Sequence, residues 1–124
     1  MKFYQYRAKV QNVVDGDTFD AYIDLGFEQY AIERVRTRGI DAREIHFVRH
    51  DSEEYQRGMK HAKFLEEWIN ESRREWDGDW PFVLESIDYN RGLYGRVIGD
   101  IYSRAKEEWS ADALLNEFED VERY

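Results

Sequence analysis

The chain has no cysteine, a single proline and no apolar run long enough to cross a membrane. The lack of cysteine excludes disulfide bonds and thiolate-bound metals. With no apolar run and no signal-peptide pattern, we expect no membrane association and a cytoplasmic location, unless a leader was removed. With one proline and no Gly/Ser-rich run there is no sign of a linker, so residues 1–124 are predicted to form a single domain.

Basic residues are also scarce, with 18 Lys and Arg against 27 Asp and Glu and a net charge of −9. This balance argues against broad electrostatic binding to nucleic acid. The charge is uneven, however, because residues 31–50 contain five arginines against three acidic residues. A local basic site on an acidic body is one interpretation, and a solubilising surface is the simpler one.

Alternating hydrophobicity predicts three consecutive strands at residues 3–14, 17–25 and 30–40, joined by Asp15-Gly16 and by a turn near Gly26. A helical period follows over 53–76, capped by Asp51 or Ser52. Its predicted buried side comprises Tyr55, Met59, Ala62, Leu65 or Glu66, Trp68 and Ile69. Strands at 80–87 and from 93 or 94 to 103 come next, and Ser110 is expected to cap a short last helix.

The element order β-β-β-α-β-β-α indicates a mainly β chain with helices, an α+β class. Five short strands with a helix between the third and fourth predict a small closed Greek-key barrel, the OB-fold. A two-layer α+β sheet is the alternative.

Chemically suggestive side chains gather where the third strand is expected to end. Arg36 lies on the strand, and Asp41 and Glu44 follow three residues apart in a turn. Polar groups at a strand end, supported by a rigid sheet, are common in functional sites. Taken alone, the stretch is equally consistent with a surface strand carrying scattered charges.

Two other segments add matching groups. Asp17 follows the Asp15-Gly16 turn, and Arg96 follows a glycine at the start of the fifth strand. A hairpin turn explains Asp15, and a surface ion pair would explain Arg96. As a set, the aspartates offer hard oxygen ligands for Ca²⁺ or Mg²⁺, and the arginines offer planar forks for phosphate. With Glu44 left to act on a water molecule, the set suits metal-assisted hydrolysis of a phosphodiester.

The same segments resemble the three signature blocks of the staphylococcal nuclease (thermonuclease) family, in the same order. They are residues 14–18 (Val-Asp-Gly-Asp-Thr), 35–44 (Val-Arg-Thr-Arg-Gly-Ile-Asp-Ala-Arg-Glu) and 94–102 (Tyr-Gly-Arg-Val-Ile-Gly-Asp-Ile-Tyr). The resemblance extends from about residue 5 to the end of the chain. It implies an OB-fold barrel and a Ca²⁺-dependent nuclease acting on DNA, RNA or both.

The resemblance also implies a role for each matching residue. One Ca²⁺, or another hard cation such as Mg²⁺, would be held by Asp17, Asp41 and the backbone carbonyl of Ala42. The scissile phosphate would be bound by Arg36 and Arg96, and the attacking water would be deprotonated or positioned by Glu44. Supporting roles fall to Asp15 in the metal loop, to Tyr94 beside the nucleotide, to Tyr124 as a base-stacking residue, and to Arg43 as an additional phosphate contact.

Two positions depart from the family pattern. Arg43 replaces a proline that fixes the family's turn, and Leu93 replaces a lysine found in some members. These departures and the acidity keep open a second hypothesis, a catalytically silent OB-fold module that binds single strands or a protein. We expect a monomer. No third ligand accompanies His46 and His50, and His61 is expected to be non-catalytic.

Overall fold

A computed structural model describes residues 3–46, 48–91 and 96–124. This part of the chain contains eight strands and two helices, in the order β-β-β-β-α-β-β-β-α-β. The barrel strands are β1 (Phe3–Asp15), β2 (Thr18–Gly26), β3 (Gln29–Thr37), β5 (Phe82–Arg91) and β6 (Val97–Ser103). The other elements are β4 (Ile40–Asp41), α1 (Glu53–Glu75), β7 (Glu108–Trp109), α2 (Ser110–Glu117) and β8 (Glu122–Arg123).

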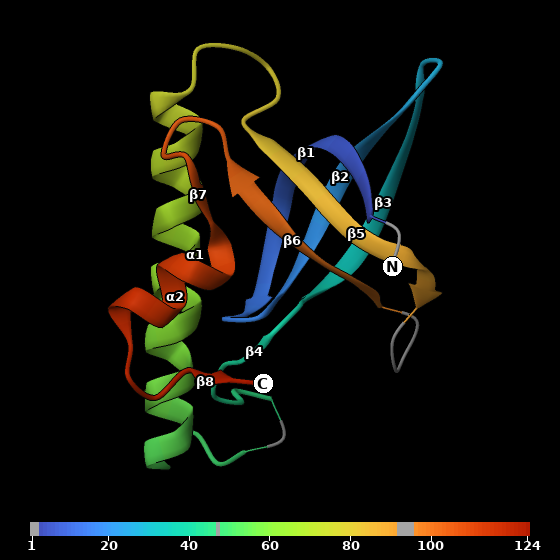
Figure 1. Ribbon diagram of the computed structural model, residues 1–124. Helices are drawn as coiled ribbons and strands as arrows, with labels where there is room; N and C mark the ends of the chain where they lie inside the picture. The colour runs from blue at the N-terminus through green and yellow to red at the C-terminus, as the bar shows by residue number, and fades with distance from the viewer. Residues whose placement is uncertain (1–2, 47, 92–95) are drawn as a thin grey trace.

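The five barrel strands close on themselves (Figure 1). β1 pairs antiparallel with β2 and β5, β2 pairs with β3, and β5 pairs with β6. Closure comes from a parallel pairing in which Val35 of β3 lies opposite Val97 of β6. The predicted OB-fold-like barrel with helices is therefore confirmed, and the two-layer alternative is wrong.

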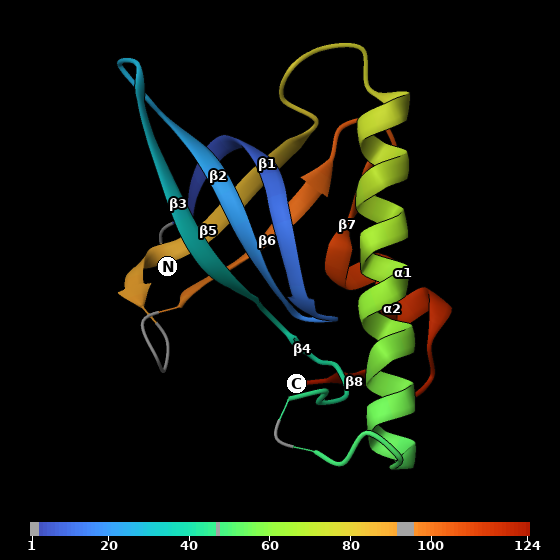
Figure 2. The same ribbon diagram turned by 180° about the vertical axis from the view of Figure 1, so that it is seen from behind.

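The third strand is shorter than predicted. β3 ends at Thr37, and Gly39 adopts φ +85°, a left-handed conformation that breaks the pleat. Ile40 and Asp41 then form β4, which pairs with β8. Figure 2 shows the consequence, because the C terminus lies beside β4 below the barrel.

Both hairpin turns are shifted by one or two residues from their predicted positions. β1 continues through Asp15, which pairs with Thr18, so the first turn is Gly16-Asp17. Asp17 therefore lies in the turn instead of opening the second strand. The second turn is Phe27-Glu28, because Gly26 still pairs with Gln29.

The long helix α1 packs beside the barrel (Figure 2). Ser52 caps it, with the hydroxyl oxygen accepting from the amide of Tyr55 at 3.1 Å. Leu65, and not Glu66, is buried, whereas Met59 is 41% exposed and was wrongly assigned to the buried face. The buried residues of α1 are Gly58, His61, Ala62, Leu65, Trp68, Ile69 and Ser72.

Ser110 is not the cap of α2, because the cap position is Trp109 and Ser110 is the first helical residue. Its hydroxyl donates to the buried carboxylate of Asp100, which also accepts from the amide of Ile101 at 2.8 Å. A buried carboxylate needs such donors, which explains why this serine faces inward. Among the described residues, no helix is apolar enough over sufficient length to cross a membrane.

Candidate functional site

Two of the predicted carboxylates converge on one predicted arginine. Nη2 of Arg36 donates to Oδ1 of Asp41 and lies 3.5 Å from Oδ2 of Asp17. Nη1 donates to the carbonyl oxygens of Thr37 and Ile40, at 2.6 and 2.8 Å. These bonds fix the guanidinium at the point where the chain leaves β3 and turns into β4.

Asp17 is held by bonds from three directions. Its Oδ2 accepts from the amide of Ala42 at 2.8 Å, and its Oδ1 accepts from the hydroxyl of Thr18 at 3.0 Å. Its own amide donates to Oδ1 of Asp15 at 3.0 Å, an Asx-type turn. A Cβ on Gly16 would lie 2.7 Å from Cβ of His61, so only glycine lets this turn lie against α1.

The carboxyl group of Asp15 has a raised pKa. Burial, together with a hydrogen bond to Asp17 and the charge of Asp17, raises the pKa of Asp15 from 3.8 to about 7, and the charge of Glu44 adds to the effect. Desolvation and like charges both oppose ionisation of a carboxyl group. The carboxyl group of Asp15 is therefore more readily protonated than an exposed aspartate.

Three further predicted residues meet at a neighbouring cavity of about 900 Å³. Asp15, Glu44 and Arg96 line it, although they come from β1, the segment after β4 and the start of the β6 segment. The carboxylate of Glu44 and the guanidinium of Arg96 therefore line the same cavity. Its remaining lining residues are Val14, Thr18, Arg34, Ile45, His46 and His50.

Glu44 is oriented by the backbone that follows it. Its Oε1 accepts from the amides of Ile45 and His46, at 3.0 and 2.7 Å. Gly58 of α1 lets this segment approach closely, since a Cβ there would lie 2.4 Å from Cγ2 of Ile45 and 2.9 Å from the carbonyl oxygen of Glu44. No period or motif marks Gly58, so sequence reasoning missed its role.

Arg43, which stands where the family has proline, uses the very N–H that proline lacks. Its amide donates to Nδ1 of His61 at 3.1 Å, so Nδ1 is the unprotonated nitrogen. Nε2 of His61 then donates to Oδ1 of Asp120 at 2.9 Å. Burial raises the pKa of Asp120, but the hydrogen bond from His61 and the charge of Arg57 outweigh it and leave that pKa below its usual value.

The side chain of Arg43 is directed to the C-terminal segment, with Nε 3.9 Å from Oδ2 of Asp120. His61 is 1% exposed, and its two hydrogen bonds link residues 41–45 to the C-terminal segment. The histidine lacked a recognisable pattern because its two partners are distant in sequence.

Tyr124, which is expected to be a base-stacking residue, lies next to Arg36. Its ring centroid is 5.9 Å from Cζ of Arg36, and its amide donates to the carbonyl oxygen of Gly39 at 3.1 Å. The ring is 71% exposed and so is available to a ligand. Tyr94 and Leu93 lie outside the described residues.

His46 and His50 both line the cavity but make separate contacts. Nε2 of His46 is 3.2 Å from the carbonyl oxygen of Val14, and His50 stacks on Tyr55 at 4.4 Å. Within residues 3–46, 48–91 and 96–124, no three His, Cys, Asp or Glu side chains are grouped to hold a metal. The donor chemistry still fits a hard cation, because Asp17 and Asp41 already direct carboxylate oxygens at one positively charged group.

No protein-family model matches the chain, and no curated protein matches it.

Proposed function

We propose that this protein hydrolyses phosphodiester bonds of DNA, RNA or both, with Ca²⁺ or another hard cation as cofactor. The observation that carries the proposal is the convergence of Asp17 and Asp41 on Arg36, beside a cavity that Glu44 and Arg96 share. These residues come from three separate segments of the sequence. The resemblance to the staphylococcal nuclease family, read from the sequence, supports the same chemistry.

In this proposal the acidic residues bind the cation and the arginines bind the phosphate. Asp17 and Asp41, with the carbonyl of Ala42, would hold the cation, which supplies positive charge to the phosphate in the transition state. With these carboxylates engaged by a cation, the guanidinium of Arg36 would bind phosphate oxygens together with Arg96. Tyr124, and by the resemblance Tyr94, would contact the nucleotide.

Glu44 acts on the water that attacks phosphorus, either by taking its proton or by orienting it. The water oxygen forms a bond to phosphorus, the bond from phosphorus to the leaving ester oxygen breaks, and solvent protonates that oxygen. The amides of Ile45 and His46 already hold one oxygen of Glu44. Because both bonds go to Oε1, they fix the orientation of the carboxylate.

A second candidate function is a catalytically silent module that binds single strands. The observation that favours it is the pairing of Arg36 with both carboxylates, which neutralises much of the site without any cation. A silent module would bind oligonucleotides equally well with and without Ca²⁺ and would leave them intact.

The proposed site is tested by Arg36→Ala and Arg96→Ala. Removing one charge-stabilising donor is expected to lower kcat about 10²-fold or more. Arg36→Lys, which keeps the charge but loses the planar fork, provides a variant that protects the fold if Arg36→Ala unfolds. The matched control is Arg74→Ala, an exposed arginine on α1. Near-normal turnover in both site variants would contradict the proposed site.

A further inference from the structure

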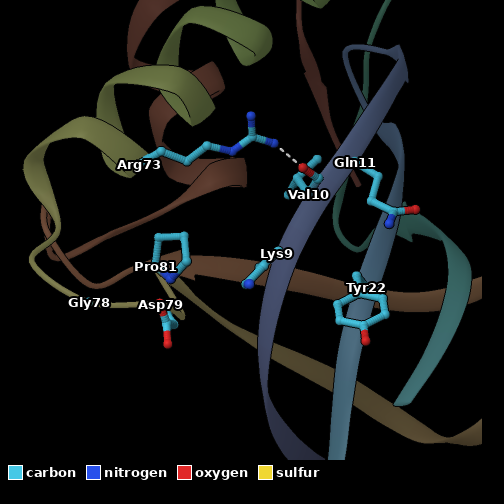
Figure 3. A pocket seen from close by; sticks show the side chains of 8 residues that line it. All are labelled: Lys9, Val10, Gln11, Tyr22, Arg73, Gly78, Asp79 and Pro81. Atoms are coloured by element: carbon cyan, nitrogen blue, oxygen red, sulfur yellow. Dashed lines mark hydrogen bonds between the residues drawn. The ribbon is translucent and has the colours of Figure 1, made fainter.

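A second group of cations and aromatic rings lies outside the candidate site. Figure 3 shows a cavity of about 510 Å³ between β1, β2, the C-terminal half of α1 and the segment that leads to β5. Its polar and aromatic lining includes Lys9, Tyr22, Arg73 and Asp79. None of these residues belongs to the three signature segments or to the cluster of Asp17, Arg36 and Asp41, which we call the carboxylate–arginine cluster.

Three aromatic rings lie almost parallel beside this cavity. The centroid of Tyr22 is 5.4 Å from that of Tyr30 and 6.0 Å from that of Trp80, with interplanar angles of 9° and 3°. Tyr30 and Trp80 are 6.1 Å apart, at 7°. Tyr30 is 49% exposed, whereas Tyr22 and Trp80 are partly buried. Parallel, partly exposed rings are the kind of surface on which nucleobases stack.

Two cations at this cavity have no carboxylate within 4 Å in the part of the chain that the structure describes. Nζ of Lys9 lies 4.8 Å from the Trp80 ring centroid. Arg73 donates to the carbonyl oxygen of Val10 and to Oδ1 of Asn70, at 3.4 Å in the second case. Their charges are therefore left for an external anion.

The acidic residues of the adjoining face of β2 are neutralised. Asp24 pairs with Arg7 at 2.5 Å, and Asp20 pairs with Arg34 at 2.8 Å. On a chain with a net charge of −9, these two ion pairs reduce the negative charge of β2, and Asp79 is the acidic residue among the described residues that line the cavity. An anionic ligand that carries flat rings fits the combination better than an acidic peptide, which offers no bases to stack.

The ring group also lies close enough to the candidate site for one strand to reach both. Thr18 lines the site cavity and Tyr22 lines the second cavity, and both belong to β2. Their spacing of four residues corresponds to about 13 Å along a strand. Side chains two and four residues apart lie on one face of a strand, so the two positions share a surface.

We propose that Tyr22, Tyr30 and Trp80, with Lys9 and Arg73, form a binding site for single-stranded nucleic acid. The rings stack on bases, and the two cations contact phosphates. The proposal deepens the proposed function, on which it rests, because the strand bound here is the one that extends into the carboxylate–arginine cluster. It assigns the second cavity to binding and not to cleavage.

The test is the binding of a fluorescein-labelled oligothymidine of twelve nucleotides, measured by fluorescence anisotropy. A chelator is present so that metal-dependent cleavage does not occur during the measurement. Trp80→Ala and Lys9→Glu are each expected to raise Kd about tenfold, the scale of losing one stacked base or reversing a phosphate contact. Trp80→Phe keeps a ring and Lys63→Glu changes an exposed lysine outside the cavity lining, so both should stay within about twofold.

Circular dichroism and thermal unfolding of each variant show that the fold survives. If Trp80→Ala and Lys9→Glu bind as tightly as the wild type, or if the wild type does not bind, the second site is wrong. Cleavage of an unlabelled oligonucleotide is measured in a separate assay with Ca²⁺ present. Binding that depends on Trp80 without any cleavage would overturn the nuclease proposal alone, whereas cleavage with unchanged binding in the variants would overturn the second site alone.

Discussion

At the scale of single residues, the amide of Arg43 holds residues 41–45 against α1 through its hydrogen bond to His61. Arg43→Pro removes the N–H that donates to His61, and Nδ1 of this buried ring is then left without its partner. An unsatisfied buried acceptor costs about 1–3 kcal/mol. We therefore expect the free energy of unfolding, measured in urea, to fall by that amount.

Arg43→Ala is the matched control, because it keeps the N–H and removes only the long contact with Asp120. A partly exposed ion pair of this kind contributes about 1 kcal/mol at most. If Arg43→Pro is as stable as Arg43→Ala, the hydrogen bond to His61 does not hold the loop.

A second residue-scale prediction concerns Asp100, which is 7% exposed. Burial raises the pKa of this carboxyl from 3.8 to about 6, against the lowering effect of hydrogen bonds from Ser110 and Ile101. The folded state therefore binds the proton more tightly than the unfolded state, so stability is lost as pH rises from about 4 to 6. The shift corresponds to about 3 kcal/mol, fully present as a penalty above pH 6.

Asp100→Asn removes this titration, so it is expected to gain stability relative to the wild type as pH rises. Denaturant unfolding at intervals between pH 4 and 7 measures the difference, and comparing the two proteins cancels the other carboxyl groups. A difference that stays constant across this range would show that Asp100 is not the group responsible.

At the scale of elements, the β2–β3 hairpin carries an unfavourable turn. Phe27 and Glu28 adopt φ +55° and +60°, and Phe27 is 98% exposed. Left-handed backbone costs about 1 kcal/mol or more for a non-glycine residue, and two such residues in a two-residue loop suit Asn-Gly. Combining Phe27→Asn with Glu28→Gly should raise the free energy of unfolding by about 1 kcal/mol, measured in urea.

Phe27→Ser alone separates the loss of an exposed ring from the relief of backbone strain, and it should have little effect. No gain in the Asn-Gly protein would mean that other contacts of the hairpin compensate for the turn.

The elements themselves were largely predictable because alternation along β1–β3 and the period of α1 are local signals. The end of β3 was not predictable. Gly39 takes a left-handed conformation there, and the next strand, β4, pairs with β8, whose residues are more than 80 positions away in the sequence. Met59 was wrongly predicted to be buried. Residues 43–45 approach α1 closely at Gly58, so Gly58 is the buried residue at this point of the helix. Side-chain types identified Asp17, Arg36 and Asp41, but only the folded chain brings them into contact.

At the scale of the whole molecule, the barrel unites segments that the sequence separates. Closure of β3 on β6 brings Arg96 to the cavity that Glu44 lines, and the C-terminal strand carries Tyr124 to Arg36. Because the chain is acidic overall, binding to a polyanion must come from these local cations. Phosphate contacts release counterions, so we expect affinity to fall steeply with salt.

The most direct measurement is cleavage of a fluorescent single-stranded oligonucleotide by the full chain in Ca²⁺, in Mg²⁺ and with chelator, alongside Glu44→Gln. Cutting is expected to require a divalent cation and to drop about 10²-fold or more in the variant. Glu44→Gln keeps an oxygen able to accept from the amides of Ile45 and His46, so the loop should retain its structure. A folded wild type that cuts in none of these conditions, or a variant that cuts as fast as the wild type, would contradict the proposed function.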